Sequence, residues 1–193
     1  MIKFILASSS PRRRQILEWA ELEFDTLVEP TDEQFPGELI PREAAVYVAQ
    51  QKAKAVASSP RYLREYDNTP ILAADTMVVC ENRIIGKPRD EKDAHRMLRI
   101  LSGKKHEVIT GVSILHRSRE VVFADATEVW FYELTDEQID FYVRQYQPFD
   151  KAGAYAIQEW IGVIGIKSIT GDFYNVMGLP ISRVYRELAA IGS

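Results

Sequence analysis

Apolar residues recur along the chain with two different spacings, and these spacings predict which segments are helical and which are extended. Five segments carry a helix-start signal followed by apolar residues on one face, as in an amphipathic helix. The predicted helices begin at Pro11 after an N-cap Ser10, at Pro41, after Asp90, at Thr135 with Gln138 as a capping box, and at Pro180. The third of these ends at Gly103, where a C-cap glycine belongs.

Continuous or alternating apolar runs between polar turns predict the strands. The runs are 2–7, 23–28, 71–79, 83–85, 106–116, 120–132 and 160–169. Two polar segments, 29–41 and 60–70, are expected to be loops, the first because three prolines and several acidic residues interrupt it.

The order of these elements bears on the fold class. Helices and strands do not alternate strictly, and the two longest strands follow each other along the chain, which favours a mixed sheet over a purely parallel one. We therefore expect an elongated α/β fold with a cleft. A chain of 193 residues is long enough for one large domain or for two small lobes that share a core.

Composition restricts the classes of protein to consider. The chain is 46% hydrophobic and 27% charged, but its formal net charge is only -4, so stable binding to nucleic acid or to an anionic membrane is not expected. No run of about 18 apolar residues predicts a membrane span, and the apolar start is too short for a signal peptide. The single cysteine, Cys80, excludes an internal disulfide and fits a reducing compartment, so we expect a cytoplasmic protein.

The segment "SSSPRRR", residues 8–14, concentrates cations where a predicted strand leads into a predicted helix. Cations are unfavourable at the positive end of a helix, by about 0.3 to 1 kcal/mol each, so a compensating anion is expected nearby. The backbone N–H groups and hydroxyls of the three serines, together with Arg12 and Arg13, would bind a phosphate group. The alternative interpretation is a solvated first helical turn.

Asp75 follows a buried apolar run, and a buried carboxylate needs a partner. It is either a structural residue that caps a turn, or a metal ligand or base held rigidly by the sheet. Lys87 follows a short predicted hairpin that would return it to the same side of the sheet, with phosphate between the two side chains. The segment 150–158, which contains Lys151, Tyr155 and Gln158, is too polar for simple core, and local signals leave open whether it is loop or helix.

Several common catalytic signatures are absent. The Walker pattern, the dinucleotide fingerprint and the G-x-S-x-G elbow do not occur. None of His95, His106 and His116 lies in an H-E-x-x-H motif, so a zinc site is not expected and these residues are interpreted as packed or exposed histidines.

Six motifs, spread over the whole chain, resemble those of one family. They are "LASSSPRRRQIL", "QQKAKAVA", "AADTMVV", "GKPRDEKDAHRMLRILSGKKHEVITGV", "FDKAGAYAIQ" and "GDFYNVMGLPI". In this order and spacing they are similar to the Maf family of nucleoside triphosphate pyrophosphatases, also called septum formation proteins. The resemblance implies a single Maf-like domain over residues 1–193, with an inosine triphosphatase-like fold: a long, bent mixed sheet, flanking helices and two lobes around a cleft.

The resemblance also implies a reaction and a site. Family members hydrolyse a nucleoside triphosphate to the monophosphate and pyrophosphate with a divalent cation, Mg²⁺ or Mn²⁺. By their places in the motifs, the implied substrate-binding residues are Ser8, Ser10, Arg12, Arg13, Thr76 and Gln158, the catalytic residues are Lys52, Asp75 and Lys87, and the metal ligands are Glu33 and Asp75.

Within the family, this chain resembles the branch that acts on dTTP and UTP, because Arg13, Thr76 and Gln158 occur together. It departs from the family at Ala156 and Glu159, where glycine is common, which affects the positioning of the base and not the reaction. Two alternatives stay open: a pyrophosphatase for 7-methyl-GTP or another modified nucleotide, and a non-catalytic nucleotide-binding regulator of cell division. The resemblance further implies a homodimer.

Overall fold

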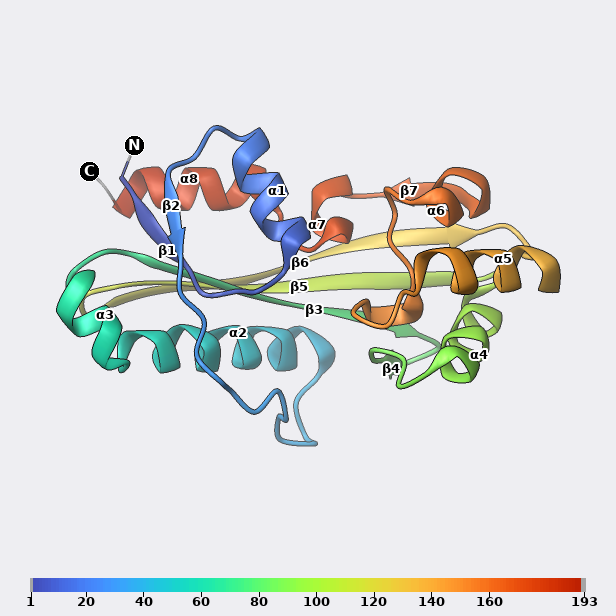
Figure 1. The fold of residues 1–193 in the computed structure, drawn as a ribbon, viewed down its shortest axis with the longest axis horizontal. Coiled ribbons are helices and arrows are strands. Elements are labelled where there is room, and N and C mark those ends of the chain that lie inside the picture. Colours follow the sequence, from blue (N-terminus) through green and yellow to red (C-terminus); the bar gives the residue numbers. More distant parts are fainter. Residues whose placement is uncertain (1, 192–193) are drawn as a thin grey trace. The chain divides into compact units, whose positions relative to one another are not determined.

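The computed structural model describes residues 2–191 and divides the chain into two compact units. Unit 1 contains the chain up to Asp75, residues 110–125 and the C-terminal part from Gly178, and unit 2 contains residues 76–109 and 126–177. Three long strands, β3, β5 and β6, pass through both units (Figure 1).

The strands form one mixed sheet. Their bounds are β1 Phe4–Leu6, β2 Phe24–Thr26, β3 Ile71–Cys80, β4 Arg83–Ile85, β5 Lys105–His116, β6 Arg119–Phe131 and β7 Ile166–Thr170. Within the described residues the strand order is β2-β1-β3-β5-β6-β7, with β4 paired to β3. β1 pairs in parallel with β2 and β3, whereas β4 and β7 pair antiparallel with their neighbours. The prediction of a mixed α/β fold is confirmed.

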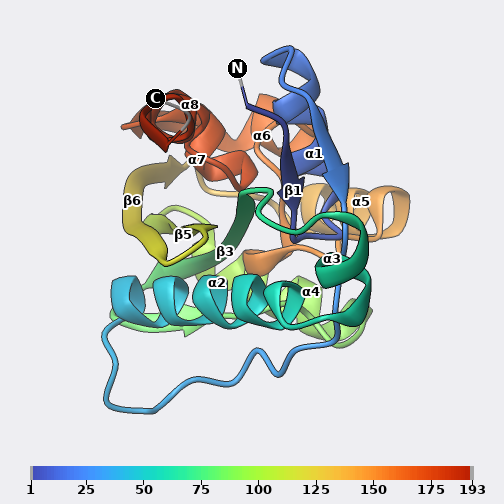
Figure 2. The same cartoon turned by 90° about the vertical axis from the view of Figure 1, so that its left-hand side faces the viewer.

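Helices flank this sheet. They are α1 Pro11–Trp19, α2 Pro41–Ala57, α3 Pro60–Glu65, α4 Glu91–Leu101, α5 Asp136–Tyr146, the short 3-10 helix η1 Ala152–Ala154, α6 Trp160–Gly165, α7 Phe173–Met177 and α8 Ile181–Ile191. In unit 1, α2 lies on one side of β3 and β5 while α1 and α8 lie on the other (Figures 1 and 2). In unit 2, α4 packs against α5 and η1. No helix within residues 2–191 combines the length and the apolar character that a bilayer crossing requires.

The expectation that 60–70 is a loop is wrong for residues 60–65, which form α3, and holds for residues 66–70. Ser59 caps this helix by accepting a hydrogen bond from the N–H of Tyr62, and Pro60 occupies its first position. Ser10 and Pro11 begin α1 by the same combination. The signal was therefore present in the sequence, but the polar residues that follow Pro60 concealed it.

The expectation of a strand over 160–169 is half wrong. Its first part is the helix α6, which begins when the Glu159 carbonyl accepts hydrogen bonds from the N–H groups of Gly162 and Val163. A Cβ at Gly162 would lie 1.8 Å from the carbonyl oxygen of Ile157, so only glycine permits this tight turn. Short apolar runs do not distinguish strand from helix by periodicity, which explains the error.

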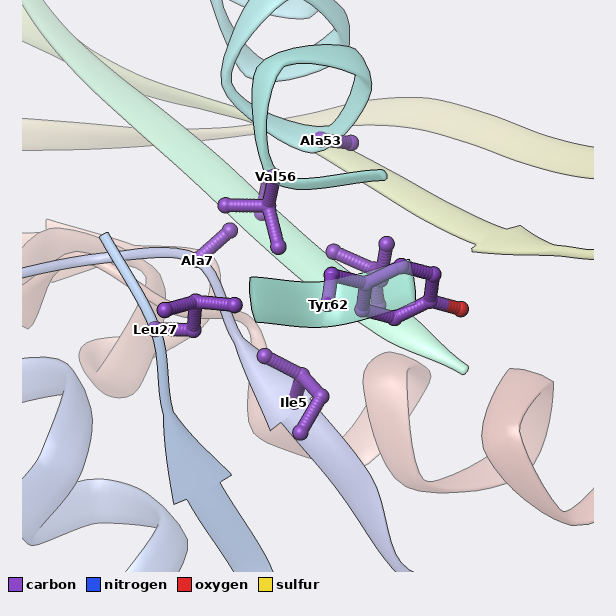
Figure 3. Packing of buried hydrophobic residues seen from close by; sticks show 8 residues of the cluster. Ile5, Ala7, Leu27, Ala53, Val56 and Tyr62 are labelled. Atoms are coloured by element: carbon purple, nitrogen blue, oxygen red, sulfur yellow. The ribbon is translucent and has the colours of Figure 1, made fainter. Parts of the chain in front are cut away.

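The core of unit 1 joins α2 to the parallel strands. Ile5 of β1, Ala53 and Val56 of α2 and Tyr62 of α3 are buried in one cluster (Figure 3). The α2 backbone also lies directly on β5, because a Cβ at Gly111 would come within 2.3 Å of the α2 main chain. This close approach fixes the distance between α2, which carries Lys52, and the sheet.

The core of unit 2 contains a buried polar pair among aromatic rings. His106 of β5 lies edge-on to Phe131 of β6 and to Tyr155, and its Nε2 is 2.7 Å from the Tyr155 hydroxyl. Burial lowers the pKa of His106 to about 4 and raises the pKa of Tyr155. Cys80 ends β3 as a buried strand residue, and burial raises the pKa of its thiol.

His106 predicts a specific pH dependence of stability. Its folded pKa, about 4, is below the ordinary value of 6.5, so between these values the unfolded chain binds more protons and the free energy of unfolding rises with pH. This rise in the free energy of unfolding is complete above about pH 6.5 and amounts to about 3 kcal/mol. Urea unfolding at pH values from 4 to 7 should show this slope, and the non-titrating variant His106→Gln should show a correspondingly smaller one. Equal slopes for both proteins would contradict the prediction.

Candidate active site

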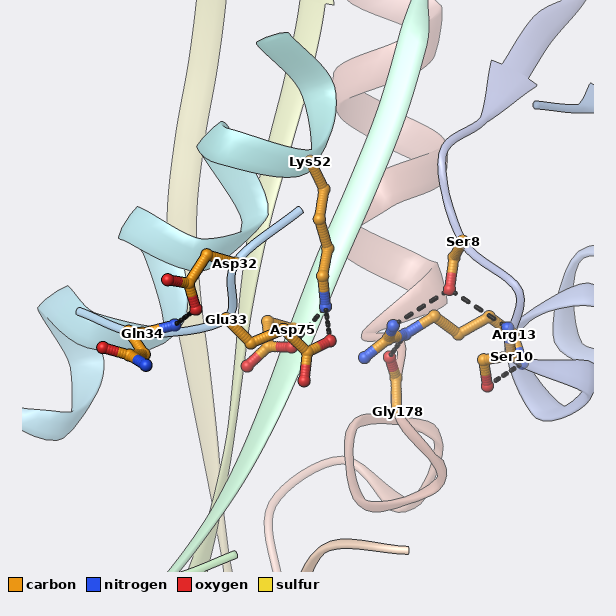
Figure 4. A network of polar contacts seen from close by, with 9 residues as sticks. All are labelled: Ser8, Ser10, Arg13, Asp32, Glu33, Gln34, Lys52, Asp75 and Gly178. Atoms are coloured by element: carbon orange, nitrogen blue, oxygen red, sulfur yellow. Dashed lines mark hydrogen bonds and ion pairs between the residues drawn. The ribbon is translucent and has the colours of Figure 1, made fainter. Parts of the chain in front are cut away.

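Unit 1 contains a lysine that lies between two carboxylates. Lys52 Nζ lies 2.7 Å from Asp75 Oδ1 and 2.8 Å from Glu33 Oε1 (Figure 4). The Lys52 and Asp75 side chains are both only 15% exposed, whereas Glu33 is 48% exposed. The structure therefore brings together three of the predicted site residues.

Each of the three residues comes from a different part of the fold. Lys52 is on α2, whose buried apolar face holds it against the sheet, and Asp75 lies within β3. Glu33 lies in the irregular segment between β2 and α2, and its ion pair with Lys52 joins that segment to the helix. A charged group that is largely removed from water needs such a partner, and Lys52 provides it for Asp75.

The loop from β1 into α1 holds a buried arginine. Arg13 is 8% exposed; its Nη1 donates to Ser8 Oγ at 3.1 Å and its Nε donates to the Gly178 carbonyl at 2.8 Å. Burial lowers the pKa of Arg13, and the carboxylates of Asp75 and Glu33 oppose that shift. Because an arginine in a protein keeps its proton, this guanidinium is a fixed positive charge.

The serine hydroxyls in this loop have structural partners. Ser8 Oγ accepts from the N–H of Ser10 at 3.3 Å as well as from Arg13, and Ser10 Oγ caps α1 by accepting from the N–H of Arg13. The N–H of Ser10, predicted from the sequence to bind phosphate, thus donates to Ser8 Oγ in the structure. Arg12 is half-buried and Arg14 is exposed, so the three consecutive arginines have three different environments.

The two predicted metal ligands, Glu33 and Asp75, fit a cation that takes its remaining ligands from phosphate and water. Within residues 2–191, no group of three or more His, Cys, Asp or Glu side chains is arranged to hold a metal ion. Glu33 and Asp75 provide carboxylate oxygens, which suit Mg²⁺ or Mn²⁺, and Lys52 Nζ lies between them. Magnesium commonly binds through one or two carboxylates and completes its shell with phosphate oxygens and water, so these two residues fit a cation that arrives with a phosphate ligand.

Unit 2 carries the other predicted site residues. Thr76 lies on β3 two residues before Val78, so both side chains lie on the same face of that strand. Gly153 of η1 packs on the Val78 side chain of this face, and its N–H donates to the Gly86 carbonyl at 3.0 Å. The segment with Lys87, which follows Gly86, is thus bonded to the segment that leads to Gln158.

Lys87 and Gln158 are both exposed, and the 150–158 segment is neither a simple loop nor a regular helix. Its η1 turn contains Gly153 at φ 71, which favours glycine. Beyond it, Tyr142 of α5 donates a hydrogen bond to Glu159 Oε2, and Lys151 Nζ lies 3.4 Å from Glu159 Oε1.

Sequence reasoning missed three contributors to these sites: the Gly178 carbonyl, Tyr142 and the side-chain role of Glu159. Gly178 had a local signal, since a glycine followed by Leu179 and Pro180 favours an unusual backbone, and its φ is 119. Tyr142 and Glu159 had none, because their contact joins residues 17 positions apart.

A mixed α/β fold that holds a buried arginine and a lysine-paired aspartate in one unit has the arrangement of charges typical of enzymes that act on anionic substrates. The sequence model of one family, described as "Maf-like protein", matches residues 3–191. The chain belongs to the Maf family.

Curated relatives support this assignment over their full length. A protein of Porphyromonas gingivalis (strain ATCC 33277) is 44% identical over 98% of this chain and 94% of its own, and one of Bacillus cereus (strain AH187) is 48% identical over 97% and 95%. Both are named dTTP/UTP pyrophosphatase. Among solved structures, the Ham1 protein of Staphylococcus aureus matches with a TM-score of 0.44 and 11% identity, over 67% of this chain and 71% of its own.

The contacts of Ser8 predict that its hydroxyl stabilises the fold. Ser8→Ala removes one acceptor from the buried Arg13 guanidinium and from the N–H of Ser10, so the free energy of unfolding should fall by about 1–3 kcal/mol. Urea unfolding measures this loss. The matched control is Ser9→Ala, an exposed neighbour, which should change stability by less than about 0.5 kcal/mol. Equal effects of the two substitutions would show that the Ser8 contacts contribute nothing.

Proposed function

We propose that this chain hydrolyses dTTP and UTP to the nucleoside monophosphate and pyrophosphate. The observation that carries the proposal is the partly buried contact between Lys52 and Asp75, in a chain of the Maf family whose relatives are named dTTP/UTP pyrophosphatase. The names of the relatives support the substrate, and the charge arrangement in unit 1 supports the chemistry.

The cations of unit 1 would hold the triphosphate. Arg13 presents a fixed positive charge beside the β1–α1 loop, and half-buried Arg12 adds a second on the following helix. Lys52 would exchange part of its contact with Glu33 for a phosphate oxygen. A charged donor already oriented by the fold stabilises developing negative charge more than water does, since it needs no reorganisation during the reaction. Lys87, in unit 2, keeps the charge-neutralising role that the resemblance implies.

Glu33 and Asp75 would hold the divalent cation through their carboxylate oxygens. Bound there, Mg²⁺ or Mn²⁺ would neutralise phosphate charge and polarise the phosphoryl oxygens. Lys52 contacts Asp75 through Oδ1 and Glu33 through Oε1, so the cation and the ammonium group would share the same two carboxylates.

Asp75 would act as the general base. It would take a proton from a water molecule whose oxygen attacks the α-phosphorus in line with the leaving group. The bond from the α-phosphorus to the bridging oxygen breaks as the new one forms, and its electron pair leaves with pyrophosphate. Lys52 holds the carboxylate in place through Oδ1, so its orientation does not depend on the sheet alone.

Gln158 would select the base. It is exposed at the end of the η1 segment, and a glutamine amide offers both a donor and an acceptor, which complement the N–H and carbonyl groups of uracil and thymine. The methyl group that separates thymine from uracil affects such a site much less than a mismatched hydrogen bond does, so both nucleotides should be accepted.

Three broader expectations accompany this function. We propose a cytoplasmic location, supported by the single, buried cysteine, and a homodimer, supported by the family resemblance. That residues 1–193 act as a single Maf-like domain stays a prediction.

The role of Asp75 is tested by Asp75→Asn. This variant keeps the shape of the side chain but removes its basicity, so pyrophosphate release from UTP should fall by about 10²- to 10⁴-fold. Circular dichroism verifies folding, and Asp67→Asn, at an exposed aspartate, should retain full activity. A folded Asp75→Asn protein with near wild-type kcat would assign Asp75 a structural role, and orthophosphate as the direct product would move the attack to the γ-phosphorus.

The role of Gln158 is tested by substrate competition. The wild type should prefer dTTP and UTP over ATP, GTP and 7-methyl-GTP, by as much as about 10⁴-fold in kcat/KM. Gln158→Ala should narrow the gap between UTP and ATP, whereas Gln15→Ala, at an exposed position on α1, should leave it unchanged. Comparable kcat/KM for all five nucleotides in the wild type, or an unchanged ratio in Gln158→Ala, would place base selection elsewhere.

A further inference from the structure

The side chain of Glu159 connects the end of the segment that carries Gln158 to the start of that segment at Lys151. Gln158 itself is exposed, but the residues before it, Tyr155, Ala156 and Ile157, are buried. The next residue, Glu159, is the N-cap of α6. Its side chain makes no capping hydrogen bond to that helix. The side chain turns instead toward α5 and the start of the segment.

Both oxygens of the Glu159 carboxylate have partners. Oε1 lies 3.4 Å from Lys151 Nζ, and Oε2 accepts a hydrogen bond from the Tyr142 hydroxyl. The Tyr142 hydroxyl in turn accepts from the N–H of Ala156 at 3.2 Å. The contacts therefore form a chain from Lys151 through Glu159 and Tyr142 to Ala156, which closes the segment 151–159 into a loop.

Burial makes this closure rigid. The Lys151 side chain is 9% exposed and that of Glu159 is 23% exposed, and Tyr142 is fully buried on α5. Loss of one partner from such a set leaves the others in a poorly hydrated place without compensation, so the contacts hold or fail together. Asp150 also contacts Lys151, at 2.8 Å, but it is 54% exposed and lies before the loop.

We propose that Glu159 is a positioning residue for base recognition: it fixes the loop 151–159 and thereby the direction of the Gln158 side chain. The proposal rests on the proposed function, because it assigns Glu159 an effect through Gln158. Discrimination by hydrogen bonds depends on the placement of the donor and acceptor within a fraction of an ångström, which an unclosed loop of this length does not provide.

The effect should appear in selectivity and not in the chemical step. Glu159 lies in the same unit as Gln158, whereas Lys52 and Asp75 lie in unit 1. Glu159→Ala should therefore lower the ratio of kcat/KM for UTP to that for ATP by about tenfold, mainly through KM for UTP, with kcat for UTP within about threefold of the wild type. Glu159→Gln can still accept a hydrogen bond from the Tyr142 hydroxyl, so it should lower this ratio less than Glu159→Ala does.

A double-substitution cycle separates positioning from a general loss of structure. If Glu159 acts through Gln158, Glu159→Ala should change the UTP/ATP ratio less than twofold when Gln158→Ala is already present. Asp150→Asn is the matched control, because it removes a carboxylate from the same lysine outside the loop, and it should leave the ratio unchanged. Hydrogen exchange of the peptide containing Ala156 should accelerate in Glu159→Ala but not in Asp150→Asn.

Each outcome decides the proposal. A tenfold loss of selectivity that disappears in the Gln158→Ala background, with faster exchange at 151–159, supports it. An unchanged ratio in folded Glu159→Ala, an equal loss in the Gln158→Ala background, or the same loss in Asp150→Asn overturns it while the pyrophosphatase activity itself stands. If Glu159→Ala fails to fold, Glu159→Gln and Tyr142→Phe take its place in the cycle. A wild type that releases no pyrophosphate from UTP or dTTP refutes the proposed function and this inference with it, although the exchange result still reports whether Glu159 closes the loop.

Discussion

The ammonium group of Lys52 between two carboxylates is the interaction on which the arrangement of unit 1 depends. Its positive charge lies within 2.8 Å of both the Asp75 and the Glu33 carboxylates and offsets their mutual repulsion. The same lysine joins three separate pieces of the chain, namely α2, β3 and the irregular segment before α2. A single cation therefore pairs with the proposed base and holds the segment that carries Glu33.

Two kinds of positive charge surround this aspartate in unit 1, and they differ in freedom. Arg13 is buried and its hydrogen bonds to Ser8 and to the Gly178 carbonyl fix its orientation, whereas Lys52, in the proposed mechanism, exchanges Glu33 for a phosphate oxygen. A fixed charge sets the potential of the site before a ligand arrives, and an exchangeable one adapts to it. In unit 2, Gln158 is exposed, whereas the contacts that hold its loop are buried and fixed by the fold.

Much of the fold follows from local signals in the sequence, and the failures have separate physical causes. Serine followed by proline begins α1, and Thr135 with Gln138 begins α5, because these side chains satisfy N–H groups a few residues away. The helix α6 was mistaken for strand since a short apolar run fits both periods. In the site, motif resemblance named Lys52 and Asp75, which the structure brings into contact, but it did not predict that contact. No local pattern indicates that Ser8 supports Arg13 or that Glu159 meets Tyr142. Such contacts depend on tertiary packing, which spacing along the chain does not encode.

Because Cys80 is buried, the rate at which a thiol reagent labels it can report on opening of the sheet. As the single sulfhydryl of the chain, it ends β3 with its Sγ 3.8 Å from the Lys105 carbonyl oxygen, and its raised pKa keeps it in the unreactive protonated form. Alkylating reagents can modify it only when the strands around it separate. The rate of labelling therefore measures the opening of the sheet directly, and none of the residues assigned to phosphate or base binding has to be altered to observe it.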